Sequence, residues 1–71
     1  MNTKLMVSNF PVTHTKDMIR KIADVFGKVK NVDILRDTAT GEFKGTVNIE
    51  YETELDAKRG QNGMMGLKVE D

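Results

Sequence analysis

The stretch Lys44-Gly45-Thr46-Val47-Asn48-Ile49-Glu50-Tyr51 decides how this chain folds. Apolar or small residues alternate with polar ones along its whole length, so every second side chain belongs to the same face. A period of two is the pattern of a β-strand that buries one face and exposes the other. Residues 44–51 are therefore predicted to form a central strand, with Thr46 and Asn48 on its exposed face.

Residues 29–36 predict a second strand, in which Val32 and Ile34 point to one face and Asp33 and Leu35 point to the other, exposed face. The run Asp37-Thr38-Ala39-Thr40-Gly41 follows, and its residues tolerate turn geometry. The two strands are therefore predicted to pair as an antiparallel hairpin.

An earlier strand is predicted in the apolar run Lys4-Leu5-Met6-Val7-Ser8-Asn9-Phe10, which Pro11 stops. Met6 has a flexible and polarizable side chain. It is suited either to contact a partner or to cover a small apolar patch.

Apolar residues at helical spacing predict a helix between the first two strands. Thr13 or Thr15 is suited to cap its N-terminus, and Gly27 is a natural residue to end it. Met18 and Val25 are expected in or near the core. The residues that recur at i, i+3, i+4 and i+7 are expected to pack on the sheet, and they are Ile19, Ile22, Ala23 and Phe26.

Residues 53–65 predict a second helix, entered at Thr53 or Glu54, whose apolar contacts are Leu55, Ala57 and Met64. One alignment carries this helix to about residue 65 and leaves the chain without a fourth strand. The other ends the helix near Arg59 and makes Leu67 to Glu70 a shortened fourth strand. We favour the first alignment.

The chain has 71 residues, which suffice for one small domain over residues 1–71. It has no cysteine, so disulfides and thiolate metal sites are excluded, and His14 is its single histidine. It has neither an apolar run that could span a membrane nor the layout of a signal peptide. We expect a soluble, intracellular protein.

The net charge is zero but unevenly distributed. Residues 1–49 carry eight basic and five acidic groups, whereas residues 50–71 carry three basic and six acidic ones. Proteins that bind nucleic acids commonly carry a basic excess, because contacts to phosphates supply much of their affinity. The charge balance therefore lowers the affinity expected for a nucleic acid.

No enzymatic role, metal or cofactor is expected. The sequence has no glycine-rich phosphate loop, no nucleophile spaced to meet a base, and no cluster of metal ligands. Its densest acidic stretch fits a strand end and a helix N-terminus, where the helix dipole favours negative charge. The residues of that stretch are Glu50, Glu52, Glu54 and Asp56.

Three segments resemble the RNA recognition motif family. Residues 44–51 keep the frame of its octamer, Lys/Arg-Gly-aromatic-Gly/Ala-aromatic-Val-x-aromatic. Leu5, Val7, Asn9 and Phe10 fit the family's hexamer. The run from Arg36 to Gly41, followed by Lys44-Gly45, matches its common hairpin sequence. Within the family, these segments are most similar to domains of spliceosomal proteins, such as the large subunit of the polypyrimidine-tract-binding splicing auxiliary factor.

This resemblance implies a ferredoxin-like α+β sandwich with the order βαββα, in which the fourth strand is missing or shortened. An antiparallel sheet would carry two helices on one face. The opposite face is where the family stacks RNA bases on aromatic rings. This chain departs from the family at three ring positions, which hold Met6, Thr46 and Asn48.

The function implied is that of a single-stranded RNA-binding module in mRNA processing or splicing, in the nucleus or cytoplasm. Stacking on a ring is worth roughly 1–3 kcal/mol per base, so the loss of three rings predicts weak binding by the isolated domain. The residues expected to contact RNA are Met6, Ser8, Asn9, Leu35, Arg36, Lys44, Thr46 and Asn48.

The alternative is a protein-interaction module on the same fold, which the missing rings and the zero net charge favour. Met6 and Leu35 would then anchor the partner as outward apolar residues. Without a fourth strand, Lys4 to Asn9 would lie at an edge of the sheet, and its unpaired backbone groups would favour self-association.

Overall fold

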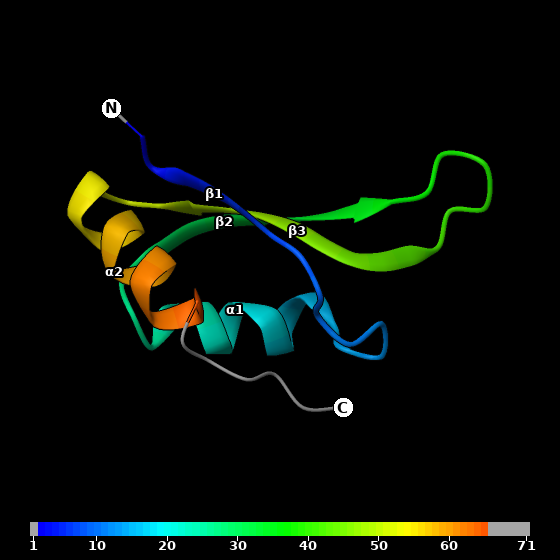
Figure 1. Ribbon diagram of the computed structural model, residues 1–71, viewed down its shortest axis with the longest axis horizontal. Coiled ribbons are helices and arrows are strands. Elements are labelled where there is room, and N and C mark those ends of the chain that lie inside the picture. The colour runs from blue at the N-terminus through cyan, green and yellow to red at the C-terminus, as the bar shows by residue number, and fades with distance from the viewer. Residues whose placement is uncertain (1, 66–71) are drawn as a thin grey trace.

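The computed structural model describes residues 2–65, in which two helices lie on one face of an antiparallel sheet (Figure 1). The strand order in this sheet is β1-β3-β2, so the strand predicted to be central lies in the middle. The predicted order of elements and the α+β sandwich are confirmed. The elements are β1 (Lys4–Val7), α1 (Lys16–Asp24), β2 (Val29–Arg36), β3 (Phe43–Tyr51) and α2 (Glu54–Met65).

The core is built on the alternation along β3. Ile49 is fully buried and lies opposite Leu5 of β1 on one side and Val32 of β2 on the other. Both helices lie on the same face of the sheet, so the inward side chains pack between the sheet and the helices (Figure 1). The buried core consists of Phe10, Ile19, Ala23, Val29, Val32, Val47, Ile49, Tyr51 and Ala57.

Tyr51 joins β3 to both helices. Its hydroxyl donates a hydrogen bond of 2.9 Å to the carbonyl of Ala23 in α1. Burial raises the pKa of Tyr51 to about 12, and the carboxylates of Asp24 and Asp56 act in the same direction. On the other side, a Cβ placed on Gly60 would lie 2.5 Å from the Tyr51 hydroxyl oxygen. Gly60 therefore allows α2 to pack closely on the sheet.

Helix α1 is capped as predicted but ends earlier. The Thr15 hydroxyl accepts a hydrogen bond of 3.2 Å from the Met18 amide, so Thr15 is the N-cap. The expectation that Gly27 ends the helix was wrong, because α1 ends at Asp24. Gly27 lacks a positive φ and instead makes room for Asp56, whose Cβ would lie 2.8 Å from a Cβ at Gly27. Core positions for Met18 and Val25 were also wrong, since both are exposed.

Helix α2 begins at Glu54, where the Thr53 hydroxyl accepts a hydrogen bond of 3.1 Å from the Asp56 amide. It continues to Met65, so the alternative end near Arg59 was wrong. The proposed strand Leu67 to Glu70 lies outside the described residues. Ala57 is buried and Met64 packs on the core as predicted, whereas Leu55 is 59% exposed and was wrongly expected to be buried against the sheet.

Strand β1 is shorter than predicted and ends at Val7. The chain turns away at Asn9, which adopts φ 70°, a left-handed conformation that asparagine tolerates better than most residues. This turn buries Phe10, whose amide donates a hydrogen bond of 3.0 Å to the Gly45 carbonyl. Gly45 has φ 95°, and a Cβ there would lie 2.6 Å from the Phe10 carbonyl oxygen. Glycine at this octamer position therefore serves a close backbone contact.

Candidate functional site

The surface of the sheet opposite the helices, here called the open face, is formed by the side chains that alternate with the core residues. Strand alternation places the predicted outward residues of β2 and β3 on it, and Ser8 extends it beyond the end of β1. The open face comprises Lys4, Met6, Ser8, Asn31, Asp33, Leu35, Lys44, Thr46, Asn48 and Glu50.

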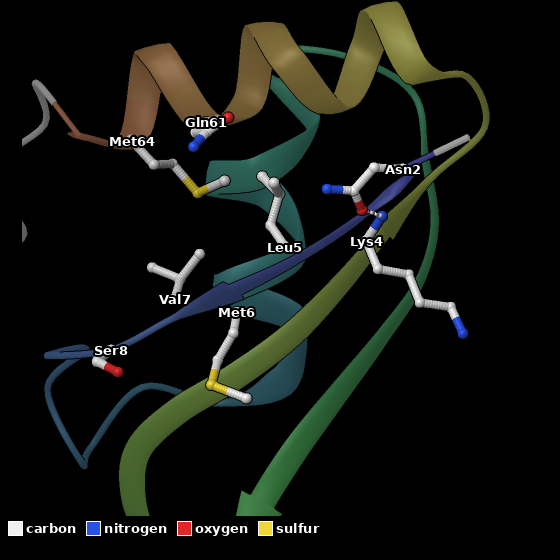
Figure 2. A pocket seen from close by; sticks show the side chains of 8 residues that line it. All are labelled: Asn2, Lys4, Leu5, Met6, Val7, Ser8, Gln61 and Met64. Carbon is white, nitrogen blue, oxygen red and sulfur yellow. Dashed lines mark hydrogen bonds between the residues drawn. The ribbon is translucent and has the colours of Figure 1, made fainter.

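The strand register orders the open face into rows that cross all three strands. In the row here called the middle row, Met6 lies opposite Asn48, and Asn48 lies opposite Asp33. Met6 is 68% exposed and points away from α2, while Leu5 and Val7 point toward it (Figure 2). Within residues 2–65, no hydrogen bond or ion pair involves the side chains of the middle row. Their polar groups are therefore available to a ligand.

Two further rows flank the middle row. On one side, Lys4 lies opposite Glu50, and Glu50 lies opposite Asn31. On the other side, the Thr46 hydroxyl donates a hydrogen bond of 3.4 Å to the Ser8 hydroxyl. The predicted contact residues Ser8 and Thr46 are thus brought together, although each already has the other as a partner.

A hollow of about 400 Å³ lies over the middle row and the row of Lys4. A volume of this size is in the range of sites that bind small molecules. Carboxylate and amide groups dominate its polar lining, with one ammonium group and the Met6 thioether. The lining residues are Lys4, Leu5, Met6, Asn31, Asp33, Asn48, Ile49 and Glu50.

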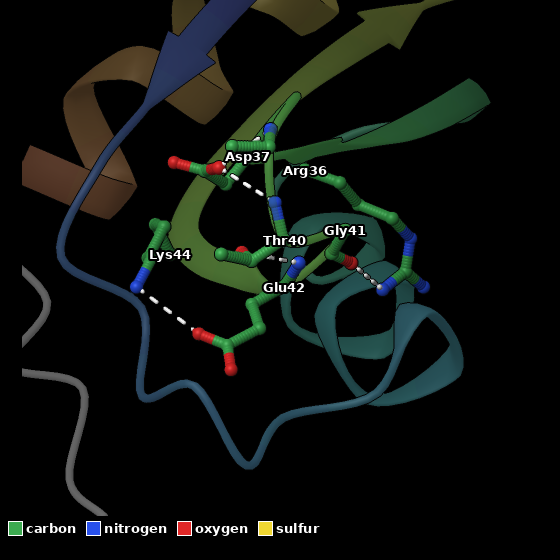
Figure 3. Close-up of polar contacts among 7 residues, drawn as sticks. Arg36, Asp37, Thr40, Gly41, Glu42 and Lys44 are labelled. Carbon is green, nitrogen blue, oxygen red and sulfur yellow. Dashed lines mark hydrogen bonds and ion pairs between the residues drawn. The ribbon is translucent and has the colours of Figure 1, made fainter.

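Lys44, one of the two basic residues expected to contact RNA, lies near the turn between β2 and β3 (Figure 3). Its ammonium group forms an ion pair of 3.2 Å with the Glu42 carboxylate, and both side chains are well exposed. A surface ion pair of this kind is worth at most about 1 kcal/mol. Lys44 can therefore leave Glu42 for a phosphate at small cost.

The turn itself is held by Asp37. Its carboxylate accepts hydrogen bonds from the amides of Ala39 (2.8 Å) and Thr40 (3.0 Å), and its carbonyl accepts one from Gly41 (2.8 Å). The amides of Thr40 and Ala39 hold the pKa of Asp37 below its usual value of 3.8. This closed network keeps the two strands in register where Lys44 leaves the turn.

Two predicted contact residues do not lie on the open face. Arg36 is paired with Phe43, which packs on the core, so its side chain belongs to the helix side of the sheet. A register shift between Ile34 and Arg36 accompanies this placement, and the guanidinium donates a hydrogen bond of 3.3 Å to the Gly41 carbonyl. Asn9 lies beyond β1, where its backbone turns the chain toward the core. Contacts of these two residues with RNA remain predictions.

A second hollow, of about 520 Å³, lies beside β1 under α2 (Figure 2). Met64 and Gln61 of α2 overhang it, and Leu5 and Val7 form its apolar floor. Within residues 2–65, β1 is an edge strand of the sheet, because β3 is its sole neighbour there. The backbone groups along its outer edge therefore face this hollow.

Sequence reasoning missed four residues of the site. It placed Asp33 on an exposed strand face and Glu50 in an acidic stretch at a strand end, but neither among the binding residues, and it did not consider Lys4 or Asn31. The alternation that identified Leu35 also identifies Asn31, and Lys4 precedes Met6 by one strand period. Strand alternation in the sequence therefore places all four residues on the open face.

Neither a metal site nor a membrane span is found in the described part of the chain. Among residues 2–65, no group of three or more histidine, cysteine, aspartate or glutamate side chains is arranged to hold a metal ion. The helices of that range are too short or too polar to cross a bilayer.

Solved structures share this arrangement of sheet and helices. The Sex-lethal RNA recognition domains 1 and 2 from Drosophila melanogaster superpose with a TM-score of 0.84 at 26% identity, over 96% of this chain and 43% of that one. The structure of the RNA15 RRM superposes with a TM-score of 0.88 over 97% of this chain and 79% of that one. Its identity is 20%, so it supports the fold alone.

Two curated human proteins are similar in sequence. Probable RNA-binding protein 23 is 30% identical over 66 residues, which cover 93% of this chain and 15% of that protein. Spliceosome associated factor 3, U4/U6 recycling protein, is 31% identical over 68 residues, or 96% of this chain and 7% of that protein. The chain thus spans a small part of these relatives. The family profile described as RNA recognition motif matches residues 5–71, and this chain belongs to that family.

Proposed function

We propose that this chain binds single-stranded RNA on the open face of its sheet and acts in mRNA processing. The middle row is the observation that carries this proposal. Its amide and carboxylate groups have no partner within residues 2–65, and they lie beside an exposed thioether on the face opposite both helices. Unpaired bases offer such a surface both hydrogen-bonding edges and apolar ring faces.

Binding is expected to use different contacts from those of a ring-bearing sheet. Met6 and Leu35 supply apolar contact, and Asn48, Thr46 and Ser8 supply hydrogen bonds to bases. Lys44 supplies a contact to phosphate. Because stacking on rings is replaced by weaker contacts, the isolated domain should bind weakly, and affinity should fall as salt rises.

The test is an NMR titration of the 71-residue chain with short single-stranded RNAs, pyrimidine-rich and random. Shift changes are expected at Met6, Ser8, Lys44, Thr46 and Asn48, and they should weaken in the Lys44→Ala variant. Lys58→Ala is the matched control, because Lys58 is an exposed lysine of α2, away from the open face. If the NMR signals of the sheet residues do not shift at millimolar RNA, the proposed function is excluded.

A protein-interaction module is the second candidate, and the exposure of Met6 and Leu35 favours it. These residues lie on β1 and β2, with the polar side chains of β3 between them, so they do not form one continuous apolar patch. Replacing both with serine should abolish partner binding while leaving the melting temperature nearly unchanged. A double variant that fails to fold would instead assign both side chains to the core.

A nuclear site of action belongs to the same proposal. Similarity to a spliceosome associated protein supports it. Localisation of the tagged parent protein by microscopy tests it, and exclusion of that protein from the nucleus would contradict it.

A further inference from the structure

We infer that Asp33 is a specificity-determining residue that selects guanine, by accepting hydrogen bonds from the Watson–Crick edge of a base lying over Met6 and Asn48. This inference rests on the proposed function and adds which base the open face prefers.

The spacing of the middle row fits one base. Adjacent strands lie about 4.8 Å apart, so the backbones of Met6 and Asp33, separated by β3, lie about 10 Å apart. A purine ring resting on the Met6 thioether and extending over Asn48 brings its outer edge to Asp33. The hollow of about 400 Å³ above these residues provides the space.

The chemistry of the Asp33 side chain determines which base edge binds favourably beside it. An ionised carboxylate is an acceptor with two oxygens, and it is best matched by two parallel N–H donors. Asp33 is exposed and has no hydrogen-bond or ion-pair partner within residues 2–65. The carboxylate of Asp33 is therefore free to accept from a ligand.

Guanine is the base whose edge matches these acceptors. Its N1–H and 2-amino groups point the same way and can donate to the two oxygens of Asp33. Its O6 lies beside them and can accept from the Asn48 amide. Uracil presents one N–H between two carbonyl oxygens, which the carboxylate repels. Adenine and cytosine each present an amino group beside an unprotonated ring nitrogen, so they offer Asp33 a single donor.

The negative charges of Asp33 and Glu50 also determine which part of the RNA approaches β2. Phosphates are repelled by Asp33 and Glu50 and attracted by Lys44, which lies toward the turn. The base edge rather than the backbone should therefore point toward Asp33.

The test compares uridine hexamers that carry guanosine, inosine or uridine at one internal position, titrated into wild-type, Asp33→Asn and Asp17→Asn chains. Inosine lacks the 2-amino group but keeps N1–H and O6. Asp17 is exposed in the first turn of α1, so Asp17→Asn changes the net charge equally, away from the open face.

The wild-type chain should bind the guanosine RNA about tenfold more tightly than the uridine RNA, with inosine between them. In Asp33→Asn this ratio should fall to within about twofold, whereas Asp17→Asn should keep it. Any general effect of charge on RNA binding cancels in the ratio.

Two results would overturn the inference. One is an unchanged ratio in Asp33→Asn, and the other is a wild-type chain whose sheet resonances shift equally with all three RNAs. Failure of the proposed function gives a different result, because no RNA would then shift the NMR resonances of the sheet residues in any variant. That outcome would remove this inference together with the proposed function.

Discussion

The ring of Tyr51 lies directly against the backbone of Gly60, so that a Cβ on Gly60 would approach two ring carbons to 2.6 Å. Intrinsic propensity favours alanine over glycine in a helix by about 1 kcal/mol, so propensity alone predicts that Gly60→Ala stabilises α2. The contact with Tyr51 predicts the opposite. Because the ring is fully buried and cannot move aside, the substitution should lower the free energy of unfolding by about 1–3 kcal/mol.

Urea denaturation measures this effect, with Asn62→Ala as the control. Asn62 is an exposed residue of the same helix, so its replacement should be neutral or slightly stabilising. A Gly60→Ala variant more stable than the wild type would show that α2 does not pack on Tyr51 as described.

Tyr51 also predicts how stability depends on alkaline pH. Its pKa is raised to about 12 in the folded state, from 10.0 in its unperturbed state, so folding favours the neutral phenol. The stabilisation is complete below pH 10 and is lost as the pH rises toward 12. The chain has one tyrosine, so the absorbance of tyrosinate reports this titration alone.

The variant Tyr51→Phe separates titration from packing. It keeps the ring but removes one of the two hydrogen bonds that the Ala23 carbonyl accepts, the other coming from the Phe26 amide at 3.2 Å, which should cost about 1 kcal/mol at neutral pH. Its stability should then depend less on pH above 10 than that of the wild type. If the free energy of unfolding falls equally steeply with pH above 10 in the two proteins, another group controls the alkaline transition.

Asp37 predicts a local change at acidic pH. Its pKa is lowered by hydrogen bonds from the Thr40 and Ala39 amides, so the ionised carboxylate stabilises the turn. This stabilisation is present above pH 3.8 and is lost as the pH falls through the lowered pKa. NMR shifts of the two amides should follow this protonation. They should not do so in Asp37→Asn, which retains an oxygen acceptor but does not titrate.

The ion pair between Glu42 and Lys44 predicts a gain in RNA affinity. Glu42→Gln releases the Lys44 ammonium and removes a negative charge near the expected phosphate contact. Affinity should rise by a few-fold at low salt, and the gain should shrink at high salt because screening weakens exposed charges. Fluorescence anisotropy measures it. An equal gain in Glu42→Gln/Lys44→Ala would show that the lysine is not involved.

Self-association through Lys4 to Asn9 stays a prediction. Because β1 ends at Val7, the segment expected to pair with another chain is β1 itself. Within residues 2–65, the outer edge of β1 pairs with no other strand. The amides of Leu5 and Val7 face β3, so the amides on the outer edge are those of Lys4 and Met6. Concentration-dependent sedimentation, together with slow exchange of the Met6 amide that appears with dimerisation, would support strand addition. A monomer at high concentration would contradict it.

The fold was largely predictable because burial imposes a period of two on the strands. In β3 one face touches the core along the whole strand, so alternation alone assigned Val47, Ile49 and Tyr51 correctly. The ends of elements were less predictable, because they depend on contacts distant in the sequence. β1 ends where Asn9 turns to bring Phe10 to Gly45, a contact that local pattern does not contain.

The candidate site was predictable in position but not in chemistry. The resemblance located the open face and correctly assigned Met6, Thr46 and Asn48 to it. Arg36 follows Val32 and Ile34 at strand spacing and lies on the helix side, so its expected contact with RNA stays a prediction that the open face does not explain. Asp33 was overlooked as a binding residue because its significance comes from lying in one row with Met6 and Asn48, which only the register reveals.

The order β1-β3-β2 has a consequence for how the chain folds during synthesis. The hairpin of β2 and β3 is local and needs only the turn at residues 37–42, so it can form early. β1 pairs Lys4 with Glu50 and cannot be completed until residue 50 has left the ribosome. Among the strands of residues 2–65, the first to be made therefore stays unpaired, with its apolar residues exposed, until most of β3 has been translated.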